Sequence, residues 1–126
     1  LPEIDVGLLG GGKHTQRLFP HSTQRRMMLT GYRVPGPELY RLGVVEASVP
    51  RDKLMETVME VARQIAAKSP AAIRLAKRTL NTIEDMTLRD GYRYEQYMTT
   101  ELGDHPDSRE AQAAFREKRA PRFSES

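Results

Sequence analysis

Glu3 is the first residue of this chain whose side chain is suited to proton transfer. It follows Pro2 and is closely followed by Ile4 and Val6, apolar neighbours that can partly desolvate a carboxylate. A partly desolvated carboxylate is suited to general acid–base catalysis. A single glutamate near a chain end is far more often a solvated charge, so Glu3 by itself does not establish an activity.

Three consecutive glycines, Gly10, Gly11 and Gly12, come soon after this carboxylate and precede a helix-like run. Glycine permits positive φ and lets the backbone approach a ligand closely. The start of the following helix favours anions and developing oxyanions. Such a run is more often a flexible loop, so it becomes a candidate site only together with Glu3.

Basic and aromatic residues alternate near the C-terminus, where Phe115, Lys118, Arg119, Arg122 and Phe123 lie within nine residues. Cations bind phosphates, and an aromatic ring can stack on a purine. The common alternative is a solvated helix end whose cations are favoured by the helix dipole.

Composition excludes several classes of function. The chain has no cysteine, which excludes disulfides and thiol catalysis, and its three histidines, His14, His21 and His105, lack the spacing of metal ligands. Lys and Arg exceed Asp and Glu by 20 to 17, a small excess that gives little support to nucleic-acid binding. No apolar run approaches the ~20 residues of a membrane span, and the start lacks a signal-peptide pattern. We therefore expect a cytoplasmic protein.

The elements that position these residues are expected to be mostly helices, with one strand at 44–49, where β-branched residues lie between Gly43 and Pro50. Apolar periodicity, caps and breakers predict helices at 15–19, 23–29, 38–42, 51–68, 70–83 and 87–101, and a last one opened by Asp107. A lone strand needs a partner sheet that this chain does not supply.

Four motifs in order resemble the crotonase family, which includes the enoyl-CoA hydratases and isomerases. The stretch 2–18 resembles PEI…GLxxxxGxTQRL, and 29–45 resembles LTGxxxxAxEAxxxGLV. The stretch 68–77 resembles KSPxAxxxAK, and 115–123 resembles FxEKRxPxF. The resemblance covers the whole chain and corresponds to the C-terminal portion of the family.

The resemblance implies a mainly α fold with short strands, the C-terminal part of a crotonase-type ββα spiral with its helical trimerisation region. Residues 1–50 would form the end of the crotonase core, with the active-site loop, short helices and last strand. Residues 51–126 would form the C-terminal helical region. A homo-oligomer, a trimer or a hexamer, is the expected assembly, with no nucleic-acid or membrane partner.

Site residues also follow from the resemblance. Glu3 would handle protons or water at the α and β carbons of an acyl-CoA, and Gly11 would lie beside the reacting carbons. Phe115 and Lys118 would contact the adenine and 3′-phosphate region of coenzyme A. No tightly bound cofactor and no metal are implied, since coenzyme A arrives as part of the thioester substrate.

This sequence departs from the family pattern at the helix entrance. The family commonly has proline at the position of Gly10 and glycines at those of Lys13 and His14. Two bulky polar residues there could shape the pocket for a polar or branched acyl group.

The sequence thus predicts an enoyl-CoA hydratase/isomerase-type enzyme. The alternatives are a crotonase with other acyl-CoA chemistry, such as a hydrolase, C–C lyase or dehydratase, and a non-catalytic helical assembly module. The first catalytic Glu and the oxyanion hole belong to the family's preceding portion, and the chain starts at Leu1 rather than Met. We therefore expect the isolated 126 residues to be inactive and the missing N-terminal portion of the same protein to be a partner.

Overall fold

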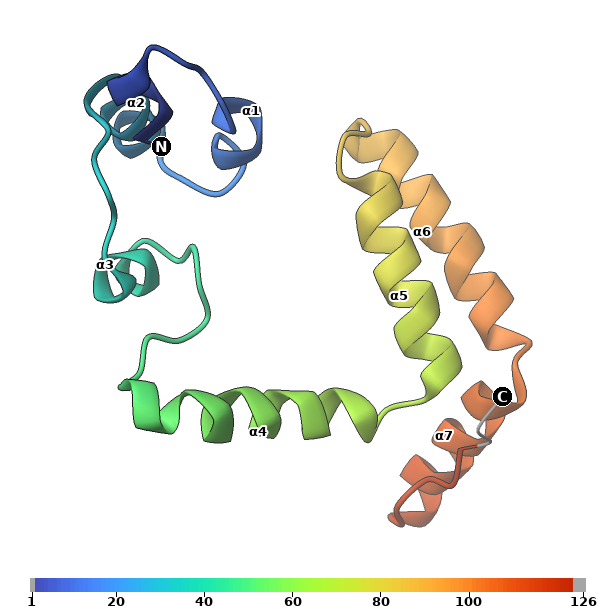
Figure 1. Cartoon of the computed structure of the whole chain (residues 1–126). Helices are drawn as coiled ribbons and strands as arrows, with labels where there is room; N and C mark the ends of the chain where they lie inside the picture. Colours follow the sequence, from blue (N-terminus) through green and yellow to red (C-terminus); the bar gives the residue numbers. More distant parts are fainter. Residues whose placement is uncertain (1, 124–126) are drawn as a thin grey trace. The chain divides into compact units, whose positions relative to one another are not determined.

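Helices joined by turns make up the computed structural model, which describes residues 2–123 (Figure 1). In chain order they are η1 (Pro2–Val6), α1 (Gly12–Thr15), α2 (His21–Thr30), α3 (Gly36–Arg41), η2 (Arg51–Lys53), α4 (Leu54–Ala66), α5 (Pro70–Ile83), α6 (Leu88–Gly103) and α7 (Pro106–Glu117), where η marks a 3₁₀-helix. The chain divides into two units, residues 1–57 and 58–126. This mainly helical architecture confirms the predicted fold class.

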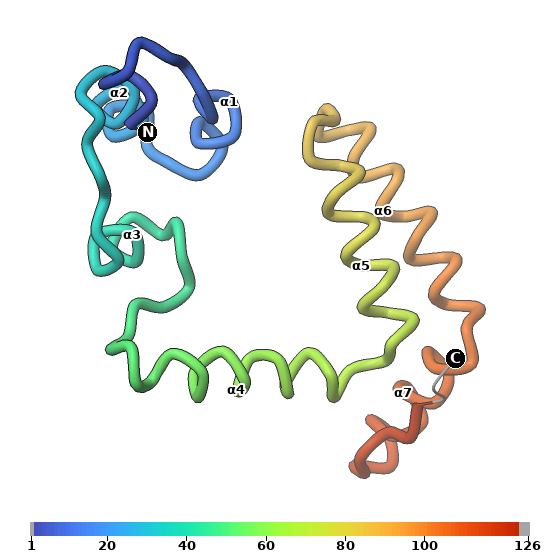
Figure 2. Tube along the Cα trace, in the orientation of Figure 1, coloured from blue at the N-terminus to red at the C-terminus, as the bar shows by residue number. Residues whose placement is uncertain are grey.

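The predicted strand at 44–49 is wrong. These residues follow α3 as a bend and an extended connection, without a strand (Figure 2). A strand is stabilised by ladder hydrogen bonds to a neighbour, and no strand occurs among residues 2–123. The β-branched composition favours extension but supplies no pairing partner.

Three of the predicted helix ends are confirmed by their caps. Gly31 ends α2 with a φ of 66°, a left-handed conformation that favours glycine. The Ser69 side chain caps α5 by accepting the N–H of Ala72, and Thr87 caps α6 by accepting the N–H of Asp90.

The predicted start of the last helix is displaced. Asp107 is not the cap of α7, because His105 takes that position and its side chain accepts the N–H of Asp107. Pro106 then occupies the first helical position, where a missing N–H costs nothing. Asp107 lies in the first turn and is 3% exposed.

Helices α5 and α6 form the main packed pair of the second unit and run side by side (Figure 1). Gly91 of α6 is buried, and a Cβ placed on it would lie 3.4 Å from the Cβ of Ile83. An ion pair of 2.9 Å between Arg78 and Glu101 joins the same two helices. Gly91 therefore allows α5 and α6 to approach closely near the turn that joins them. The ion pair between Arg78 and Glu101 connects the two helices farther from that turn.

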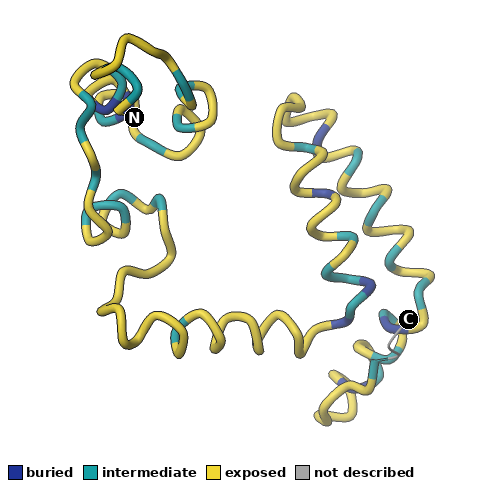
Figure 3. The backbone as a smooth tube through the Cα atoms, in the orientation of Figure 1, coloured by how far each residue is buried: buried dark blue, intermediate teal, exposed yellow. Residues whose placement is uncertain are grey.

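Few side chains are buried. In the described part of the chain, the buried apolar residues are Met27, Ala71 and Ala114. Helix α4 is exposed along almost its whole length (Figure 3). Its apolar side chains, each 42–65% exposed, are Leu54, Met55, Val58, Met59, Val61 and Ile65. The apolar stripe predicted for this helix is present, and it is left uncovered.

Candidate active site

Glu3 lies on η1, and a tight turn brings the following chain back toward it. The N–H of Leu8 donates to the carbonyl oxygen of Glu3 at 2.9 Å, and the N–H of Gly7 donates to that of Ile4 at 3.1 Å. Gly7 has a φ of 73°, which a residue with a side chain rarely adopts. The turn places Gly10 beside the Glu3 side chain.

The carboxyl group of Glu3 packs against the backbone of the glycine run. A Cβ placed on Gly10 would lie 3.6 Å from Cγ of Glu3 and 3.8 Å from its Oε1, which is ordinary contact. Its Oε2 is shielded from solvent and has no hydrogen-bond partner among residues 2–123. A small pocket here is lined by Glu3, Ile4, Leu8, Leu9, Gly10 and Met28. The carboxylate thus has one oxygen that accepts no hydrogen bond from the described residues.

Gly11 starts the helix that follows this pocket. Its φ of 69° is left-handed, and it is the N-cap of α1. The N–H and the hydroxyl of Thr15 both donate to its carbonyl oxygen, at 3.0 and 3.1 Å. A Cβ placed on the adjacent Gly12 would lie 3.3 Å from Cε of Met28, so α2 closely limits the space behind this loop.

Lys13 and His14 lie on α1, and both are exposed. The structure therefore confirms their place at the entrance of this helix, directly after Gly11 and Gly12. Their contact with an acyl group stays a prediction.

The sequence did not predict the close contact between Gly31, at the end of α2, and Asp5 of η1. A Cβ placed on Gly31 would lie 2.9 Å from Oδ2 of Asp5, a separation too short for two such atoms. Gly31 is therefore required both by its positive φ and by the carboxylate beside it. Sequence reasoning assigned Gly31 only a helix end, because nothing in the local pattern links it to residue 5.

Phe115 and Lys118 belong to the second unit, at the end of α7. The Phe115 side chain is 86% exposed, as an aromatic available for stacking should be. Lys118 follows the last helical residue with φ 54° and ψ 39°. Between residues 2 and 123, no ion pair involves Lys118.

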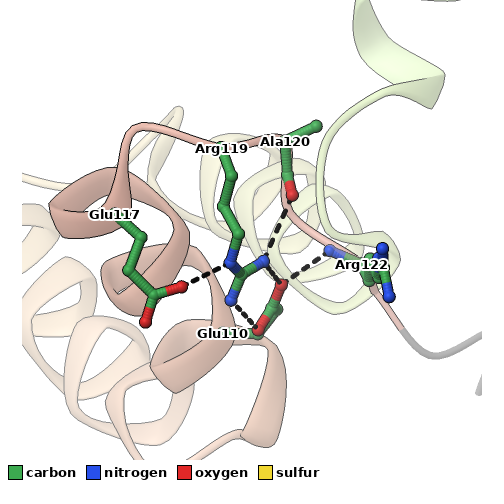
Figure 4. A network of polar contacts seen from close by, with 5 residues as sticks. All are labelled: Glu110, Glu117, Arg119, Ala120 and Arg122. Carbon is green, nitrogen blue, oxygen red and sulfur yellow. Dashed lines mark hydrogen bonds and ion pairs between the residues drawn. The ribbon is translucent and has the colours of Figure 1, made fainter.

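Arg119, by contrast, is already paired within the chain (Figure 4). Its guanidinium donates to both carboxylate oxygens of Glu110, at 2.6 and 3.0 Å, and to Oε2 of Glu117 at 2.5 Å. The backbone N–H of Arg122 donates to Glu110 at 2.8 Å. The Arg119 side chain, and next the Arg122 backbone, lower the pKa of Glu110 to about 2. We expected Arg119 to supply charge for a ligand, but in this structure it organises the end of the chain.

No group of three or more His, Asp or Glu side chains within the described residues is placed to hold a metal ion. Nor is any helix in that part of the chain long and apolar enough to cross a bilayer.

Comparison with known proteins gives these positions a context. The family model described as Enoyl-CoA hydratase/isomerase matches residues 1–126. The chain is 38% identical over 122 residues to the (7aS)-7a-methyl-1,5-dioxo-2,3,5,6,7,7a-hexahydro-1H-indene-carboxyl-CoA hydrolase of Rhodococcus jostii, covering 97% of this chain and 47% of that protein. It is 32% identical over 126 residues to the 2,3-dehydroadipyl-CoA hydratase of Escherichia coli, covering 98% and 49%.

Comparison with solved structures points to the same family. The enoyl-CoA hydratase from Bacillus anthracis superposes with a TM-score of 0.93 at 29% identity, covering 100% of this chain and 50% of that one. The chain thus spans about half the length of the relatives it matches.

Proposed function

The chain belongs to the enoyl-CoA hydratase/isomerase family, and we propose that it supplies the Glu3-bearing half of an acyl-CoA hydratase or isomerase. It corresponds to a C-terminal portion of the family's members. The observation that carries the proposal is the Glu3 carboxylate, which packs against Gly10 and whose Oε2 is shielded and lacks a hydrogen-bond partner among the described residues.

Glu3 would act as a general base and then as a general acid. In hydration, its carboxylate takes a proton from water while the water oxygen forms a bond to the β carbon of an enoyl thioester. A proton is then delivered to the α carbon, so that one water is added in total. In an isomerase, the same carboxylate would move a proton from one carbon to another, with no net addition.

The rest of the machinery is expected in the half of the family that this chain does not match. By resemblance, the first catalytic Glu and the backbone donors for the enolate oxygen belong there. Such donors commonly make the largest contribution to catalysis. We therefore expect the isolated 126 residues to have no turnover with crotonyl-CoA.

Phe115 and Lys118 would hold the nucleotide end of coenzyme A. The exposed ring can stack on adenine, and the ammonium can pair with the 3′-phosphate. The thioester substrate would bring coenzyme A with it, without a tightly bound cofactor.

A second candidate function is hydrolysis of a ring C–C bond in a cyclic acyl-CoA thioester. It is favoured by the 38% identity to a CoA hydrolase and by the exposed Lys13 and His14 at the helix entrance. A panel of enoyl-CoA and cyclic oxo-acyl-CoA thioesters separates the two functions. Hydration consumes the conjugated double bond, whereas hydrolysis of a ring C–C bond creates a new carboxylate.

The test of the proposed function is Glu3→Gln in the complete polypeptide, with whatever precedes residue 1 in place. We expect kcat on crotonyl-CoA to fall by about 10²–10⁴-fold with KM little changed, because general acid–base catalysis is lost while binding is kept. Asp5→Asn is the matched control, since Asp5 lies on the same 3₁₀-helix and is exposed. Equal turnover in Glu3→Gln and wild type would refute the role of Glu3.

A homo-oligomer, a trimer or a hexamer, belongs to the same proposal. The uncovered apolar side chains of α4 support it, since exposed apolar faces of this extent mark interaction surfaces.

A further inference from the structure

Lys118 has an unusual backbone conformation for its residue type. It is the only non-glycine residue between 2 and 123 with a positive φ. It ends α7 in a Schellman motif. The N–H of Arg119 donates to the carbonyl oxygen of Ala114 at 3.0 Å, and the N–H of Lys118 donates to the carbonyl oxygen of Phe115 at 3.3 Å. Glycine is the usual residue at this position, because a side chain makes the left-handed conformation costly.

Side-chain bonds fix the residues on both sides of Lys118 (Figure 4). The preceding Glu117 and the following Arg119 are joined by a 2.5 Å hydrogen bond. Arg119 is also held by the two oxygens of Glu110, which lies two turns earlier on α7. Glu110 in addition accepts the N–H of Arg122 and so fixes the returning chain. A costly conformation persists where the surroundings determine it in this way.

These bonds pair Arg119, but not Lys118, with carboxylates of the same chain. Arg119 is neutralised by two carboxylates, whereas no carboxylate pairs with Lys118 among the described residues. The strained position is thus occupied by a cation that forms no ion pair within the described residues.

We propose that Glu110 and Arg119 are positioning residues for Lys118: their bidentate pair holds the left-handed turn that presents the Lys118 ammonium to an anionic group. The inference rests on the proposed function, in which that anion is a phosphate of coenzyme A. Glu110 and Arg119 do not touch the ligand themselves. Their effect on binding passes through Lys118.

The test measures binding of free coenzyme A by calorimetry, in the complete polypeptide, so that no turnover is needed. Lys118→Gly should weaken binding by about tenfold or more, because a charged hydrogen bond is lost. The same variant should raise Tm by about a few degrees, because glycine relieves the turn. Loss of affinity with gain of stability is a result that a purely structural role of Lys118 does not give.

Glu110→Gln should also weaken binding in the wild-type background, because Gln lacks the second oxygen that the Arg119 fork requires. In the Lys118→Gly background it should have no further effect on the dissociation constant, since the residue through which it acts is gone. Lys53, which pairs with Glu56 on an exposed helix start, offers the matched control: Glu56→Gln should leave binding unchanged.

Two results overturn the inference in distinguishable ways. If Glu110→Gln weakens binding equally in both backgrounds, the positioning role is wrong and the coenzyme A contact stands. If Lys118→Gly leaves the dissociation constant unchanged, the coenzyme A contact itself is wrong, and the positioning role fails with it. Turnover of the same proteins tests the role of Glu3 independently.

Discussion

Two glutamates of this chain show how the surroundings of a carboxylate suit it to different tasks. Glu110 accepts three hydrogen bonds from Arg119 and the Arg122 backbone, which fix it as a charged structural group. Glu3 has an oxygen that is shielded and has no partner among residues 2–123, and our proposal assigns proton transfer to this carboxylate. Both residues were visible in the sequence, but only the three-dimensional structure distinguishes their surroundings.

The low pKa of Glu110 predicts how acid affects the end of the chain. Its value in the folded protein, about 2, lies below the ordinary 4.5, so the network contributes stability above about 4.5 and loses it as pH falls toward 2. NMR of residues 119–123 should therefore show them loosening over that range. In Glu110→Gln the same residues should be loose at every pH, and a transition that persists in this variant would contradict the assignment.

At the residue scale, the sequence indicates the local surroundings of a side chain but does not show its contacts with distant residues. It selected Glu3 from its apolar neighbours and its motif, and the shielded Oε2 agrees with partial desolvation. It counted Arg119 among the available cations, because the sequence does not show that Glu110 lies beside it.

Helix ends were the most predictable elements. Ser69, Thr87 and Gly31 act through backbone groups within a few residues, and all three ends were predicted. The strand at 44–49 failed for the opposite reason, since a strand depends on a partner that can lie anywhere along the chain or outside it.

Ser69 has a second bond that a local cap lacks. Its hydroxyl donates to the buried Asp107 of α7 at 2.6 Å while accepting the N–H of Ala72 at 3.1 Å. Ser69→Ala should therefore lower the free energy of unfolding by about 2–4 kcal/mol, the cap plus a buried bond to a carboxylate. Urea unfolding of the complete polypeptide measures this.

Thr87→Ala is the matched control for that measurement. Thr87 caps α6 in the same way, but its other bond joins Asp90 in its own first turn. A loss of about 1 kcal/mol is expected from the cap. Equal losses in the two variants would show that the Ser69–Asp107 bond contributes nothing.

On the scale of the whole molecule, the apolar surface of α4 is the main departure from a self-contained domain. The buried apolar side chains of the described residues are few and mostly small, whereas Val58, Val61 and Ile65 are each nearly half exposed. The periodicity of 51–68 predicted the stripe correctly. It could not identify a partner surface for the stripe, because the periodicity of a helix describes only the helix itself.

Ile65→Glu tests whether a second copy of the chain provides that cover. A charge on the stripe should weaken self-association by about 1–2 kcal/mol or more per contact, since apolar burial is lost and a charge must be desolvated. Gln64→Glu adds the same charge at the neighbouring position, outside the stripe. Sedimentation should show dissociation of Ile65→Glu at concentrations where Gln64→Glu stays associated, and identical behaviour of the two would exclude this face from the assembly.

The close approach of Asp5 to Gly31 has a consequence for how this sequence can vary. The end of α2 and the helix that carries Glu3 share one small volume, since a Cβ at residue 31 would meet the Asp5 carboxylate at 2.9 Å. The residue that can be accepted at position 31 therefore depends on the size of the residue at position 5. In a randomised library selected for activity, a side chain at 31 should be rare because of the positive φ, and it should be recovered only together with a smaller residue at 5. Glycine at 31 leaves residue 5 free to change.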